Sequence, residues 1–103
     1  MQVHRGVKGI VRDTSGVGVA GADIVVHDNN GTSAKNVTSS ARGEFWKLLL
    51  PGQYRMTAYH DLCSTRGVIL YSRTVEMTLQ DDRVMVVLDL LLDRVGQCQK
   101  TPR

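Results

Sequence analysis

The sequence contains little of what defines several classes of protein. Its 103 residues include two prolines and ten glycines, which excludes collagen-like and proline-rich chains. The longest unbroken apolar run is the segment Val84–Leu88, whereas a membrane-spanning helix needs about 20 apolar residues, so we expect no membrane insertion. Hydrophobic residues make up 42% and charged residues 22% of the chain, as in globular proteins. The length predicts one domain.

Aromatic residues are also few, and basic residues are not clustered. Phe, Trp and Tyr together make up 5% of the chain, and the 13 Lys and Arg residues, which give a net charge of +3, are spread over both halves. Nucleic-acid-binding domains usually concentrate basic side chains on one face and interleave aromatic ones. This distribution predicts a solvated surface of mixed charge and no nucleic-acid partner.

The residues that usually carry chemistry are scattered. Cys63 and Cys98 lie too far apart for a Cys-x-x-Cys zinc or redox motif. His4, His27 and His60 are isolated, and His60 with Cys63 would supply only two zinc ligands. The sequence has no Gly-x-Ser-x-Gly motif and no phosphate-binding loop. We therefore predict no catalytic, cofactor-binding or metal site in this chain, and no cofactor.

The chain does have hydrophobic residues that alternate with polar ones, interrupted by turn signals such as Asn30-Gly31 and Pro51-Gly52. No segment has a convincing helical period. An irregular stretch is expected from His60 to Gly67, and 68–79 reads as one bent strand or two short ones. The alternation predicts strands over 7–12, 22–27, 35–38, 44–50, 54–59, 68–71, 74–79 and 84–92.

About seven short strands without helices predict an all-β fold, an antiparallel β-sandwich. We expect the sandwich to occupy residues 1–94 and a C-terminal tail to occupy 95–103, loose unless Cys98 holds it. In the last strand Val86 is expected to face the core and Val87 the opposite side. A single Trp on a strand of a small sandwich is usually in the core, so Trp46 is expected there.

Some features depend on the compartment of the protein. Cys63 follows the strand that ends near Tyr59, and Cys98 follows the last strand, so in a sandwich they can meet and form a disulfide that holds the tail. In a reducing compartment they would be buried thiols instead. Asn30 and Asn36 each begin an Asn-x-Thr triplet, which makes them candidate N-glycosylation sites in a secreted protein.

Three motifs, in this order and spacing, resemble a known family. They are His4-Arg5-Gly6-Val7-Lys8-Gly9, then Gly21-Ala22-Asp23-Ile24-Val25-Val26, then Gly43-Glu44-Phe45-Trp46-Lys47-Leu48-Leu49-Leu50-Pro51-Gly52-Gln53-Tyr54. Together they resemble the transthyretin-like domain that follows the catalytic domain in metallocarboxypeptidases of the N/E subfamily. The resemblance covers roughly residues 3–59. The chain departs from the family pattern at Lys35, at Tyr59–Cys63 and in the segment 62–73.

The resemblance implies a transthyretin-like β-sandwich that is not itself catalytic. Its partner would be a catalytic carboxypeptidase domain in cis, which holds the zinc, removes C-terminal Lys and Arg, and works in the secretory pathway or outside the cell. The domain would support the folding, stability or placement of that partner. The alternative is an independent extracellular transthyretin-like binding or adhesion module. A third reading, a hydroxyisourate hydrolase, is disfavoured because those enzymes end in a Tyr-Arg-Gly-Ser-like motif, whereas this chain ends in Gln99–Arg103.

Two apolar segments predict self-association through sheet edges when the fold opens. Val84–Leu88 combines high β-propensity with no charge and no proline, and Leu48–Leu50 is a shorter segment of the same kind. Charged residues at 81–83, before the last strand, and Asp89, Asp93 and Arg94, within or after it, act as gatekeepers. We therefore expect the native domain to stay in solution and the partly unfolded one to associate.

Overall fold

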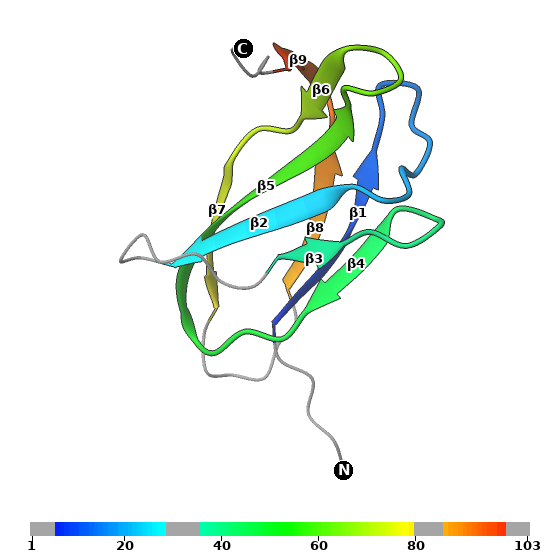
Figure 1. Ribbon diagram of the computed structural model, residues 1–103. Helices are drawn as coiled ribbons and strands as arrows, with labels where there is room; N and C mark the ends of the chain where they lie inside the picture. The colour runs from blue at the N-terminus through cyan, green and yellow to red at the C-terminus, as the bar shows by residue number, and fades with distance from the viewer. Residues whose placement is uncertain (1–5, 29–35, 80–85, 99–103) are drawn as a thin grey trace.

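The computed structural model describes residues 6–28, 36–79 and 86–98 (Figure 1). These residues form β-strands and no helix, so none of them belongs to a helix that could cross a membrane. In chain order the strands are β1 (Val7–Arg12), β2 (Asp23–Asp28), β3 (Val37–Thr38), β4 (Glu44–Lys47), β5 (Gly52–Leu62), β6 (Val68–Tyr71), β7 (Val75–Leu79), β8 (Val86–Leu91) and β9 (Arg94–Gln97). The prediction of an all-β chain is confirmed.

The strands form two sheets that pack face to face. Sheet A has the order β4-β1-β8, and sheet B has the order β3-β2-β5-β6-β9. β7 also belongs to sheet B: it pairs with the first half of β5, whereas β6 pairs with the last residues of β5. Side chains from both sheets fill the space between them, which confirms the sandwich. The buried hydrophobic residues are Val7, Val11, Val19, Ala22, Ile24, Val26, Phe45, Leu49, Met56, Ala58, Met77, Leu79, Leu90 and Leu92.

One strand pair is parallel, which the antiparallel interpretation of the sequence did not include. β1 runs antiparallel to β4 but parallel to β8, with Val7 opposite Val86 and Arg12 opposite Leu91. The segment that connects this parallel pair contains most of the domain rather than a single crossover helix. As a result β1 is the central strand of sheet A, and β4 and β8 are its two edges (Figure 1).

Trp46 does not lie in the core, so that expectation is wrong. Phe45 is 5% exposed and Trp46 is 47% exposed. The reason is the register between β4 and β1, which places Phe45 opposite Gly9. A Cβ atom at Gly9 would lie 2.9 Å from the Phe45 ring, so only a glycine leaves room for the ring inside the sandwich. Because strand side chains alternate, Trp46 then faces outward.

Several strand ends also differ from the expected ones. β4 ends at Lys47 rather than at residue 50. β5 continues to Leu62 because its last residues pair with β6, so the irregular stretch expected from residue 60 begins later. The tail expected after residue 94 begins inside β9, which pairs with β6. The stretch 68–79 forms two strands, β6 and β7.

The turn that follows β1 is organised by Asp13. Its carboxylate accepts hydrogen bonds from the Ser15 hydroxyl (2.8 Å) and from the backbone N–H groups of Ser15 (2.9 Å) and Val17 (3.1 Å). These donors stabilise the charged form, so they lower the pKa of Asp13, with the Ser15 hydroxyl as the largest cause. The turn sends the chain back toward β1, where Arg12 and Gly18 form an isolated bridge.

Candidate functional site

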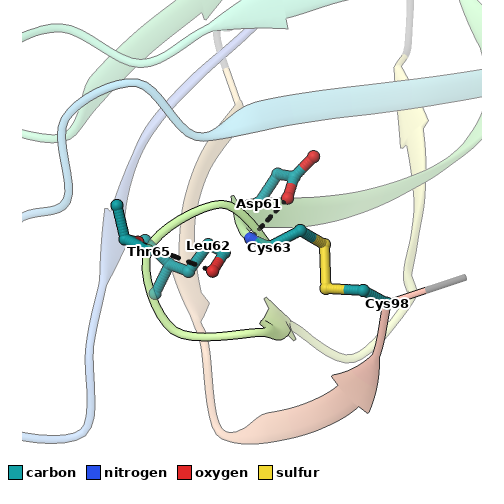
Figure 2. The surroundings of a disulfide bond; sticks show 5 residues. All are labelled: Asp61, Leu62, Cys63, Thr65 and Cys98. Atoms are coloured by element: carbon teal, nitrogen blue, oxygen red, sulfur yellow. Dashed lines mark hydrogen bonds between the residues drawn. A yellow bond between two sulfur atoms is a disulfide. The ribbon is translucent and has the colours of Figure 1, made fainter. Parts of the chain in front are cut away.

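The two cysteines form a disulfide at one end of sheet B (Figure 2). Their Cα atoms lie 5.8 Å apart, and the bond joins the turn after β5 to the residue that follows β9. The turn is ordered by hydrogen bonds: the Cys63 N–H donates to the Asp61 carboxylate (2.9 Å), and the Leu62 carbonyl accepts from the Arg66 N–H (2.7 Å). The bond holds β9 against the rest of the sheet.

The structure does not bring the histidines together within the described residues. His27 lies in β2 on the outer face of sheet B, and His60 lies in β5 on the inner face. His4 lies outside the described residues. One group of metal-ligating atoms, from Asp61, Cys63 and Cys98, lies within 4.8 Å, but both sulfur atoms belong to the disulfide and are not thiolates.

Of the two candidate glycosylation sites, Asn36 lies within the described residues. Asn36 is exposed and directly precedes β3. Thr38, the third residue of its triplet, donates a hydrogen bond from Oγ1 to the Asp23 carboxylate (3.3 Å). Asn30 lies outside the described residues.

Several exposed apolar side chains lie on the outer face of sheet A. Lys8 of β1 lies between Trp46 of β4 and Val87 of β8, and Trp46 and Val87 are 47% and 66% exposed. Ile10 of β1 shares this face one pleat further along. These outward side chains line an open hollow of about 540 Å³.

The chain beyond β4 extends this apolar surface. Leu48 is 59% exposed and Leu50 is 75% exposed, while Leu49 between them is buried. We call the outward residues Ile10, Trp46, Leu48, Leu50 and Val87 the apolar patch. Exposed apolar side chains are common singly, but a contiguous group of them marks an interaction surface.

One ion pair borders the apolar patch. Arg12 of β1 donates hydrogen bonds through Nε and Nη2 to the two carboxylate oxygens of Asp89 in β8. Both side chains are solvent-exposed, so the pair contributes little to stability. It satisfies the charges of Arg12 and Asp89 only. Lys8 and Glu44 also lie on this face and line the hollow beside Trp46.

The sequence contains the apolar residues of the patch but does not show which of them face outward. Trp46, Leu48 and Leu50 belong to the Gly43–Tyr54 motif, in which every second residue from 46 to 50 is large and apolar. Phe45 and Leu49 in the same motif are also apolar. Because both alternating sets of this run are apolar, the pattern does not show whether Phe45 and Leu49 or the patch residues face the core. The pairing of β4 with β1 determines this.

The fold places the chain in the class of two-sheet sandwiches of the transthyretin type. The solved 5-hydroxyisourate hydrolase of Klebsiella pneumoniae aligns with 92% of this chain and 97% of its own chain, with a TM-score of 0.59. The two sequences are 13% identical, so this similarity concerns the fold alone.

The sequence comparison then gives the family. Residues 6–90 match the carboxypeptidase regulatory-like domain, and the chain belongs to that family. It is 42% identical over 77 residues to carboxypeptidase D of Anas platyrhynchos, 45% over 58 residues to that of Homo sapiens, and 44% over 57 residues to the carboxypeptidase N catalytic chain of Mus musculus. These matches cover 74%, 55% and 55% of this chain, but only 5%, 4% and 12% of the relatives. The resemblance inferred from the motifs is confirmed.

Proposed function

We propose that the chain is a non-catalytic accessory domain of a zinc metallocarboxypeptidase of the secretory pathway, or of an inactive relative, that removes C-terminal Lys and Arg. Its partner is the catalytic domain of the same polypeptide, which holds the zinc. Membership of the regulatory-like domain family supports this parent. The observation that carries the docking role is the apolar patch on the outer face of sheet A.

The position of the patch suits a partner that is joined upstream of β1. The backbone of Gly6, directly before β1, lies against Lys47 and Leu48, so the chain joins the sandwich beside the exposed leucines. A catalytic domain tethered there is held at high local concentration next to the patch. Interfaces between domains of one chain bury roughly 600–1,500 Å², and a partner that binds only the folded state stabilises it.

Two further features support a secretory pathway protein. Disulfides persist in oxidising compartments and are rare in the cytosol, and Cys63 and Cys98 are bonded here. The exposed position of Asn36 makes its triplet accessible to a glycosyltransferase. The Asn36→Gln variant, expressed in a secreting eukaryotic cell, is expected to lose one glycan in the intact mass.

The docking role is tested by removing the patch in the parent protein. Replacing Trp46 and Leu50 together with Ser is expected to destabilise the parent by about 2 kcal/mol or more, because aromatic anchors dominate such interfaces. Differential scanning calorimetry of the parent and its secreted yield are the measurements. In the 103-residue chain alone Leu50→Ser is expected to cost less than about 0.5 kcal/mol, because Leu50 is 75% exposed. Trp46→Ser is expected to cost about 1 kcal/mol there, because its ring is half-buried in the sheet surface.

The matched control is Val95→Ser. Val95 of β9 is 66% exposed, but it lies in sheet B, away from the patch. Equal effects of the control and the double variant on the parent would contradict docking through the patch. The absence of catalysis is tested separately: turnover of a peptide with a C-terminal Arg by the 103-residue chain alone would overturn it.

A further inference from the structure

A second surface lies on the outer face of sheet B, on the opposite side of the sandwich from the apolar patch. β5 pairs with β7 through Gly52–Met56 and with β6 through Tyr59–Leu62, so the pairing breaks opposite Thr57 and Ala58. Ser72 fills this break. Its N–H donates to the Ala58 carbonyl (3.0 Å), and its hydroxyl accepts from the Ala58 N–H (2.9 Å).

The break is a built part of the sheet rather than a frayed strand end. Ser72 is 2% exposed and Ala58 is fully buried, and both backbone groups of Ala58 are satisfied there. Interruptions of this kind redirect the side chains that follow. An open hollow of about 400 Å³ lies over the break, and besides Ser72 the residues that line it are Thr57, Tyr59, Tyr71, Arg73, Thr74 and Arg94. Its volume is in the range of small-ligand sites.

Two tyrosines line one side of the hollow. Tyr59 of β5 lies opposite Tyr71 of β6, and Tyr71 lies opposite Arg94 of β9. The two rings are stacked, with centroids 6.3 Å apart and an angle of 29° between their planes. Aromatic faces carry partial negative charge and accept polarised C–H groups or a flat ring. The stacked pair therefore leaves an outer ring face open to a ligand, and the row ends in a guanidinium group.

Two arginines supply positive charge to this hollow. Within the part of the chain that the structure describes, neither the Arg73 nor the Arg94 side chain has a hydrogen-bond or ion-pair partner, in contrast to Arg12 with Asp89. None of the lining residues is acidic. Asp89 and Asp93 line an adjoining hollow that Arg73 also lines.

Asp23 extends the tyrosine row on β2. Asp23 of β2 lies opposite Tyr59, at the end of the row away from Arg94, and its carboxylate accepts the hydrogen bond from Thr38. Asp23 and Arg94 thus lie at opposite ends of the row. Asp23 disfavours an anion at its own end of the row, and Arg73 and Arg94 favour one in the hollow that they line.

Hydroxyl groups complete the lining. The Oγ1 atoms of Thr57 and Thr74 lie 2.8 Å apart and share one hydrogen bond, which leaves them able to donate and accept further bonds. The hollow thus combines ring faces, neutral hydroxyls and guanidinium groups, which bind oxyanions in bidentate fashion.

We infer that this hollow binds an acidic sugar, a pyranose ring that carries a sulfate or carboxylate group. The ring lies on Tyr59 and Tyr71, the oxyanion pairs with Arg73 and Arg94, and ring hydroxyls bond to the threonine hydroxyls. An acidic peptide would use the arginines but would leave the tyrosine platform and the hydroxyl pair without a matching group. The site lies on sheet B, so a partner docked on sheet A leaves it open.

The test is a titration of the 103-residue chain with a heparin-type sulfated hexasaccharide at about 0.15 M salt, where exposed long-range charge is screened. The binding constant and the shifted amide signals are measured by NMR. We expect the shifts to map to residues 57–59, 71–74 and 94. The double variant Arg73→Gln, Arg94→Gln is expected to weaken binding about tenfold or more, and Tyr59→Ser about threefold or more.

The matched control is the double variant Arg42→Gln, Arg66→Gln, which removes the same charge from two exposed turn positions outside the hollow. Equal weakening by the two double variants would show binding to net charge alone and would overturn the inference. A hyaluronate oligosaccharide that binds in place of the sulfated one identifies a carboxylate as the oxyanion and supports the inference. A Glu-rich peptide that binds as tightly as both sugars, and equally to Tyr59→Ser, would overturn it.

Discussion

At the scale of single residues, Gly43 shows how closely the loops pack on sheet A. It precedes β4 with a φ of +85°, and its carbonyl accepts a hydrogen bond from the Val11 N–H (2.8 Å). A Cβ atom there would lie 2.5 Å from the Val11 carbonyl oxygen and 2.7 Å from the Val19 nitrogen. Both neighbours are backbone atoms, which cannot move aside as a flexible side chain can.

Gly43→Ala is therefore expected to destabilise the domain by about 3 kcal/mol or more, from the left-handed backbone and the overlap together. Gly16 provides the control, because it has a φ of +88° but no atom within 4 Å of a built Cβ. Gly16→Ala is expected to cost about 1 kcal/mol, from the backbone alone. Urea unfolding of the two variants gives the comparison, and equal costs would mean that Gly43 is not crowded.

At the scale of elements, β8 is an edge strand with one face toward the core and the other toward solvent. Val86 packs partly against the core, and Val87 is 66% exposed on the outer face. β8 pairs with β1 and is an edge strand of sheet A as the described residues form it. The inward and outward faces predicted from the alternation are therefore confirmed for these two residues.

Val86→Lys is expected to cost about 3 kcal/mol or more, because it places a charge against the core. Val87→Lys is expected to change stability by less than about 0.5 kcal/mol and to lengthen the aggregation lag, because a lysine on an edge strand opposes pairing with another chain. Thermal unfolding and the thioflavin lag time of the isolated chain are the measurements. A similar loss of stability in both variants would contradict the assigned faces.

The elements also show what the sequence could and could not predict. Strands β2 and β5 were predictable because Ile24, Val26, Met56 and Ala58 alternate with polar residues, so burial and pattern agree. β9 was not predictable, because Arg94–Gln97 contains a single large apolar residue. Its pairing with β6 and the adjacent disulfide hold it, and both are long-range interactions.

The candidate sites also differ in how far local sequence patterns predict them. The Cys63–Cys98 pairing followed from where the expected strands end, and the structure contains it. The apolar patch required the register of β4 on β1, and the sheet B hollow required the break opposite Ala58. Registers and breaks depend on pairing between distant strands, which local patterns do not encode.

At the scale of the whole molecule, the disulfide restrains the unfolded chain as well as β9. It closes a loop with a sequence separation of 35 residues, which corresponds to about 3–4 kcal/mol in the chain-entropy model. The double variant Cys63→Ser, Cys98→Ser is expected to lose stability of that order and to expose the β9 amides to rapid hydrogen exchange.

The control for this experiment is the unmodified chain, unfolded with and without a reductant. Reduction and the double substitution are expected to give the same loss of stability and the same exchange pattern. Unchanged protection of the Val95 amide in the double variant would contradict the view that the bond holds β9 in place.

The parallel pairing of β1 with β8 has a consequence for how the protein is made. Val7 of β1 lies opposite Val86 of β8 in the parallel pair. β1 can therefore pair with β8 only when nearly all of the domain has left the ribosome. A nascent chain that stops before β8 has a β1 with one open side, which invites pairing with other chains. A polypeptide segment synthesised before this domain leaves the ribosome earlier. It is therefore present before β8 pairs with β1, and it can cover the open side of β1 during that interval.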